Sequence, residues 1–166
     1  MRMPDDVAEG FSRQITTEMA SAAAYLQMSV FFADRNLTGM RRWMRAQAEE
    51  ERSHALRFLD FLLDRGQRPA LGETPAPATE FADPGAAFAA ALEQEQRVTQ
   101  AIHELHRLAT ESGDLASVPF LLEFVSEQTE EEAMVETILD RIRLADGDAS
   151  ALLILDQQLG ARPASA

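Results

Sequence analysis

Four glutamates and one histidine interrupt the apolar faces of four amphipathic stretches in this sequence. They are Glu18 in the first stretch, Glu51 and His54 in the second, Glu95 in the third and Glu131 in the fourth. Each lies near the middle of a run in which apolar residues recur at intervals of three and four, the period of an α-helix. These side chains are therefore predicted to face a core, where an ionised carboxylate is very costly unless it is compensated.

A pair of bound cations is the simplest compensation for these acids. Several carboxylates in one core repel one another, and this core has no matching inward arginine. Carboxylate oxygens with one imidazole suit Fe, Mn or Zn, and Glu51 and His54, three residues apart, share one helix face. A single glutamate on a helix is usually a solvated surface residue, and a Glu-x-x-His pair is common by chance. The joint occurrence on four helices is what predicts a two-metal site.

The elements that would position these residues are four long helices and a short one. Their expected ranges are about 6–34, 38–65, 84–112, 115–144 and 150–159. The break around 35–39 is only a few residues long, so the first two helices should be antiparallel. The last segment is too short to be stable alone and must dock on the rest.

The segment 66–83 is predicted to be a crossover loop, because it contains three Pro and two Gly residues and no periodicity. The helix before it would be roughly 40 Å long, and an extended loop of this length reaches up to about 60 Å. The loop can therefore run the length of the bundle and start the third helix parallel to the second. We predict an all-α fold, a four-helix bundle with one long crossover and a short fifth helix, as a single domain over residues 1–166.

Composition and charge exclude several classes of function. The formal net charge is −13, which argues against a nucleic-acid partner. There is no cysteine, so thiol catalysis and cysteine-ligated zinc or iron are excluded. The N-terminus lacks the apolar segment of a signal peptide, and the longest strongly apolar run, 151–155, is too short to span a bilayer. We expect a soluble cytoplasmic protein with no membrane partner.

Three stretches of the sequence resemble motifs of the non-haem bacterial ferritins. The stretch AQAEEERSH at 46–54 resembles the ferroxidase motif of the second helix in that family, and SEQTEEE at 126–132 resembles the fourth-helix motif. The stretch LEQEQRVTQ at 92–100 is similar to the third helix. The resemblance extends over nearly the whole chain and implies the ferritin-like antiparallel four-helix bundle.

The resemblance also implies which residues hold a di-iron centre. Glu18, Glu51 and His54 would hold the first iron, and Glu51 would bridge to the second. Glu95 and Glu131 would hold the second iron. With one histidine the centre would be rich in oxygen ligands, which suits iron that passes through on its way to storage.

Further residues match positions around that centre in the family. Gln128 would lie beside the second iron, close to bound oxygen. Tyr25 would lie next to the centre, where its phenol can hydrogen-bond a ligand or supply an electron; a core aromatic is the alternative reading. Glu50, Glu127 and Glu130 match a third, peripheral iron site of bacterial ferritins.

Two departures separate the chain from the haem-binding relatives. Arg52 stands where bacterioferritins carry the methionine that ligates haem, directly after the second-helix glutamate. Gln128 and Glu131 replace their Glu-x-x-His pair on the fourth helix. We therefore predict no haem, and the metal implied by the resemblance is iron.

The activity implied by the resemblance is that of an iron-storage subunit with ferroxidase activity. Such a subunit oxidises Fe(II) to Fe(III) with O₂ or H₂O₂ and deposits ferric oxyhydroxide inside a cage of twenty-four subunits. The last helix would pack around the fourfold axes of that homo-oligomer. The sequence does not distinguish the two oxidants, nor co-assembly with a second kind of subunit.

Two alternatives remain open from the residues alone. A di-iron or di-manganese peroxidase or oxygenase would need a substrate pocket beside the metals and would accumulate no mineral. A metal-free structural bundle would be equally or more stable after Glu18→Ala or Glu51→Ala, since each change removes an uncompensated buried charge.

Overall fold

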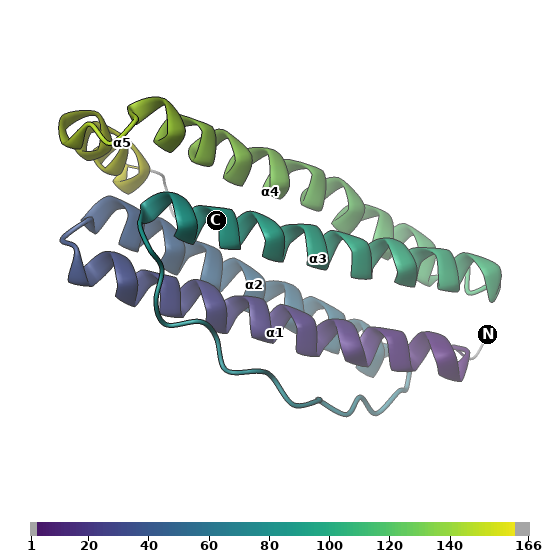
Figure 1. Cartoon of the computed structure of the whole chain (residues 1–166). Coiled ribbons are helices and arrows are strands. Elements are labelled where there is room, and N and C mark those ends of the chain that lie inside the picture. The colour runs from purple at the N-terminus through teal and green to yellow at the C-terminus, as the bar shows by residue number, and fades with distance from the viewer. Residues whose placement is uncertain (1–2, 162–166) are drawn as a thin grey trace.

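A computed structural model describes residues 3–161 of the chain, and this part contains five helices and no strand. The helices are α1 (Asp5–Asp34), α2 (Thr38–Asp64), α3 (Pro84–Glu111), α4 (Ser117–Ala145) and α5 (Ala149–Gly160). The first four lie side by side as a bundle, and α5 lies across one end of it (Figure 1). The predicted fold class is confirmed. No described helix is both long and apolar enough to cross a membrane.

The connection between α2 and α3 is the long crossover. It leaves one end of the bundle and runs along α1 to the opposite end, where α3 begins (Figure 1). The Gly72 amide donates a hydrogen bond to Thr16 Oγ1 at 2.9 Å, which attaches the loop to α1. Asp83 then caps α3 by accepting from the Ala86 amide at 2.8 Å, and Pro84 occupies the first turn. As a result α3 runs parallel to α2.

The interior of the bundle consists of two separate apolar clusters. One contains Tyr25, Trp43 and Phe88, and the other contains Phe11 and Phe124. On every long helix the residues of the two clusters occupy different halves, and the polar residues predicted to bind metal fall between them. The fold thus holds a polar layer across the middle of the bundle, enclosed by apolar side chains at both ends.

Helix α5 is docked on the start of α2 through a buried carboxylate. Asp156 accepts hydrogen bonds from the Gly39 and Met40 amides at 3.1 and 2.7 Å, so it caps the N-terminus of α2 from another helix. The backbones approach closely here, because a Cβ added at Gly39 would lie 1.7 Å from the Asp156 carbonyl oxygen. On the same helix Leu153 and Ile154 are exposed, each 58% accessible.

Candidate metal centre

The polar layer brings together all five predicted iron ligands from the four long helices. Glu18, Glu51 and Glu95 are fully buried, and Glu131 and His54 are 7% and 5% exposed. The apolar clusters on both sides exclude water from these groups. The electrostatic field of Glu18, Glu95 and Glu131 reaches Glu51, so the four carboxylates share one site.

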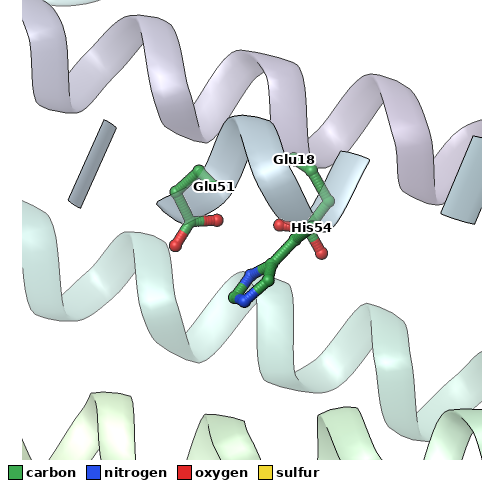
Figure 2. Close-up of side chains that lie close together, drawn as sticks. All are labelled: Glu18, Glu51 and His54. Carbon is green, nitrogen blue, oxygen red and sulfur yellow. The ribbon is translucent and has the colours of Figure 1, made fainter. Parts of the chain in front are cut away.

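Three of these residues are close enough to share a single ion. One donor atom from each of Glu18, Glu51 and His54 lies within 4.8 Å of the other two. Figure 2 shows the three side chains together, with Glu18 on α1 and the other two on α2. Glu51 and His54 reach the same place because a spacing of three residues puts both on one face of α2.

Several buried atoms of this layer have no hydrogen-bond partner among the described residues. They are Glu18 Oε2, both carboxylate oxygens of Glu51, His54 Nδ1 and Gln128 Oε1. Buried polar atoms in folded proteins are nearly always paired, so a concentration of orphaned acceptors calls for an external partner. Four of the five are carboxylate or imidazole atoms, the donor set that suits a hard or borderline divalent cation. The residues present therefore fit metal ions.

Two glutamines that the sequence analysis did not select as site residues orient the carboxylates. Gln14 Nε2 donates to Glu18 Oε1 at 2.7 Å, and Gln47 Nε2 donates to Glu131 Oε2 at 2.8 Å. Such bonds fix the direction in which the remaining carboxylate oxygens point. The position of Gln14 in the sequence could have indicated this role, because it lies one helical turn before Glu18 on the same apolar face.

Glu95 is held by two other residues of the layer. The Tyr25 hydroxyl donates to Glu95 Oε1, and Gln128 Nε2 donates to Glu95 Oε2 at 3.1 Å. Tyr25 is fully buried and contacts Trp43 edge to face, with the ring centroids 6.1 Å apart. The structure thus places Tyr25 and Gln128 next to a predicted ligand of the second iron. Their roles toward bound oxygen remain predictions.

Burial and mutual repulsion change the protonation of the layer. The pKa of Glu51 is raised well above its ordinary value, first by burial and then by the charges of Glu18 and Glu95. Burial also raises the pKa of Glu95, although the hydrogen bonds from Tyr25 and Gln128 partly offset this. The pKa of Tyr25 is raised by burial and by the adjacent Glu95, so its phenol keeps its proton. A cation that enters the layer would favour the ionised form of Glu51 and so lower this raised pKa.

The metal-free protein is expected to lose stability as the pH rises above the ordinary glutamate pKa of 4.5. In the unfolded chain Glu51 ionises near that value, whereas in the folded protein its raised pKa retains the proton. The folded state then binds more protons, and stability falls by up to about 1.4 kcal/mol per pH unit for each such proton. Chemical denaturation of EDTA-treated protein between about pH 5 and 8 measures this. Glu51→Gln should make the free energy of unfolding depend less steeply on pH. An equal dependence in both proteins would contradict the raised pKa of Glu51.

The residues predicted to form a third site line a surface pocket beside this layer. Glu50, Glu127 and Glu130 surround a pocket of about 700 Å³, and the pocket also reaches His54 and Glu131. Glu127 is engaged by an arginine in this structure, with Arg57 Nη1 3.0 Å from both of its oxygens. Binding of a third iron by these residues stays a prediction.

Arg52, the residue on which the prediction of no haem depends, is exposed on α2. Its Nε donates to Glu49 Oε2 at 3.1 Å. Arginine has no lone pair with which to ligate haem iron. The absence of haem stays a prediction.

Comparison with known proteins gives consistent matches over almost the whole chain. The ferritin family, described as a ferritin-like domain, matches residues 8–145. The bacterial non-heme ferritin of Staphylococcus saprophyticus is 35% identical over 157 residues, covering 95% of this chain and 94% of that protein. The corresponding protein of Bacteroides fragilis is 34% identical over 158 residues, covering 95% and 98%.

A solved structure agrees with these matches. The open-pore ferritin from the hyperthermophilic archaeon Archaeoglobus fulgidus superposes with a TM-score of 0.96 at 40% identity, covering 98% of this chain and 99% of that one. Fold, site composition and sequence similarity all lead to one conclusion: this chain belongs to the ferritin family.

Proposed function

We propose that this protein is a subunit of an iron-storage ferritin that oxidises Fe(II) within the polar layer of its bundle. Glu18, Glu51 and His54 would bind one Fe(II), and Glu95 and Glu131 the other, with Glu51 between them. The observation that carries the proposal is the set of buried carboxylate and imidazole atoms without partners between two apolar clusters. Only a multivalent cation compensates this arrangement well.

A pair of Fe(II) ions supplies the electrons that the reaction needs. Two Fe(II) give up two electrons, which with two protons reduce one O₂ to H₂O₂ or one H₂O₂ to two water molecules. The protein would bind and orient the ions: Gln14 and Gln47 direct the carboxylates of Glu18 and Glu131. Bound metal would favour the ionised form of Glu51, whose pKa burial raises. The oxygen-rich site with a single imidazole would release Fe(III) to a ferric oxyhydroxide store.

The exposed apolar side chains near α5 support assembly into a shell. Leu153 and Ile154 are each 58% exposed in the single subunit, and Leu144, near the end of α4, is 84% exposed. Large apolar side chains with this much exposure can mark subunit contacts. We propose a closed homo-oligomer of twenty-four copies in which these residues are covered by neighbouring α5 helices and the stored iron lies inside.

The two alternatives are less well supported by the structure. A peroxidase or oxygenase acting on an organic substrate would need a largely apolar pocket beside the metals. The pocket that reaches His54 and Glu131 is instead lined by Arg and Glu side chains on most sides. A metal-free bundle would leave one oxygen of Glu18 and both oxygens of Glu51 buried without a hydrogen-bond partner.

Two experiments test the proposal. Size-exclusion chromatography with light scattering measures the mass of the assembly, and anaerobic Fe(II) loading followed by rapid mixing with oxidant measures the rate of oxidation. We expect the mass of a large closed shell and rapid oxidation of two Fe(II) per subunit, followed by slower accumulation of ferric mineral. A monomer or small oligomer would contradict the storage role. Oxidation no faster than in buffer would contradict the ferroxidase role.

A further inference from the structure

One carboxylate at the edge of the polar layer lies between a predicted iron ligand and an arginine. Glu127 Oε2 is 3.5 Å from His54 Nε2, and Arg57 Nη1 lies 3.0 Å from each oxygen of Glu127. Glu127 also borders the 700 Å³ pocket that Glu130 lines. The same carboxylate can therefore serve the histidine or a metal ion in the pocket.

Arg57 is held in place by contacts other than Glu127. Its Nη2 donates to Glu123 Oε2 at 2.9 Å, and its guanidinium carbon lies 4.2 Å above the centre of the Phe124 ring. Arg57 on α2 thus contacts about one turn of α4, the turn that contains Glu123, Phe124 and Glu127. A planar guanidinium fixed by a second carboxylate and an aromatic ring forms a directional partner for Glu127.

The two nitrogens of His54 have different surroundings. Nδ1 is buried without a partner among the described residues. The His54 side chain is close enough to Glu18 and Glu51 for the three to hold one metal ion. Nε2 faces Glu127. When Nδ1 binds a metal, the ring proton is on Nε2, and a carboxylate in that position fixes the orientation of the imidazole.

We propose that Arg57 is a positioning residue that keeps Glu127 directed at His54 and withholds it from metal ions in the pocket. The central pair of ions then binds to a pre-oriented histidine. A peripheral ion gains Glu127 as a ligand only when the ion pair with Arg57 opens. Arg57 would thus set the order in which iron fills the subunit, an inference that rests on the proposed metal centre.

Calorimetric titration of the EDTA-treated, assembled protein with redox-inactive Zn(II) tests this ordering without relying on activity. For the unmodified protein we expect two tight ions per subunit and a weaker third. Arg57→Gln should weaken the central step and strengthen the peripheral one, each by about tenfold, in the range seen for partners of metal ligands. If Arg57 acted only through its positive charge, its loss would raise the affinity of both binding steps. Opposite changes in the two affinities therefore identify a positioning role.

Matched variants complete the test. Arg52→Gln removes the same charge from an exposed position on the same helix and should leave both steps nearly unchanged. Arg57→Lys keeps the charge without the planar fork and should fall between Arg57→Gln and the unmodified protein. Glu130→Gln should weaken only the peripheral step, whereas Glu127→Gln should weaken both.

The outcomes separate this inference from the proposed function. Suppose that the unmodified protein binds two central ions, but that Arg57→Gln changes the affinities of the central and peripheral steps in the same direction, or changes neither more than Arg52→Gln does. The positioning role is then wrong, and the metal centre stands. If the unmodified protein binds no Zn(II) and no Fe(II) in the layer, the proposed function fails, and this inference fails with it.

Discussion

Glu51→Gln is expected to lower the rate of rapid Fe(II) oxidation by about a hundredfold or more, the upper end of the losses seen when metal sites are disturbed. In the proposed centre Glu51 would contact both ions, and both of its oxygens lack hydrogen-bond partners within the described structure. The same change should make the metal-free protein equally or more stable, because it removes a buried acid whose ionisation is unfavourable. Rapid mixing with optical detection of Fe(III) and denaturation of metal-free protein measure the two effects.

Glu49→Gln is the matched control for this experiment. Glu49 lies on the same helix two residues earlier, but it is exposed and pairs only with Arg52 among the ion pairs described. It should change neither oxidation nor stability appreciably. A Glu51→Gln protein that oxidises Fe(II) at the original rate would contradict the metal centre. A metal-free Glu51→Gln protein that is markedly less stable would show that the carboxylate is compensated in some other way.

Gly39→Ala is expected to detach α5 from the bundle and prevent assembly of the shell. The added methyl would lie 1.7 Å from the Asp156 carbonyl oxygen, which is backbone and cannot turn away as a flexible side chain can. Overpacking typically costs about 1–3 kcal/mol, and losing the Asp156 cap on α2 adds about 0.5–2 kcal/mol. Both costs fall on the contact that docks α5, a helix of twelve residues.

Assembly and metal binding should respond differently to Gly39→Ala. Size-exclusion chromatography is expected to show small species, whereas Zn(II) titration should still show the two central ions, because the polar layer is formed by α1 to α4 alone. Gly72→Ala is the control, since its added methyl meets only the Thr16 side chain at 3.4 Å, an ordinary contact. A Gly39→Ala protein that assembles normally would show that α5 docking is not required for the shell.

The architecture was accessible from sequence because its signals are local. Apolar residues at helical intervals predict each long helix, and the prolines and glycines of 66–83 predict the loop. The length of that loop then favours a crossover along the bundle, which the structure confirms. The docking site of α5 could not be predicted. It depends on a contact between Asp156 and Gly39, which are far apart in sequence, and an aspartate on a short helix resembles a solvated residue.

The same distinction applies to the site. A glutamate that interrupts an apolar face is visible in the sequence, so Glu18, Glu51, Glu95 and Glu131 could be selected, and the structure does bury them in one layer. Partners that meet these carboxylates only through helix packing could not be selected from the sequence. The bond from Gln47 to Glu131 joins α2 to α4, and so does the pairing of Arg57 with Glu127. The position of Gln47 on the apolar face was visible in the sequence, but its partner on another helix was not, and Arg57 resembles a surface residue.

Anomalous diffraction at the iron edge, on crystals loaded with Fe(II) without oxygen, tests the central claim most directly. The proposed centre predicts two strong peaks per subunit inside the bundle, one among Glu18, Glu51 and His54 and the other beside Glu95 and Glu131. Peaks confined to the protein surface, or an interior without iron while these carboxylates keep the positions described, would contradict it.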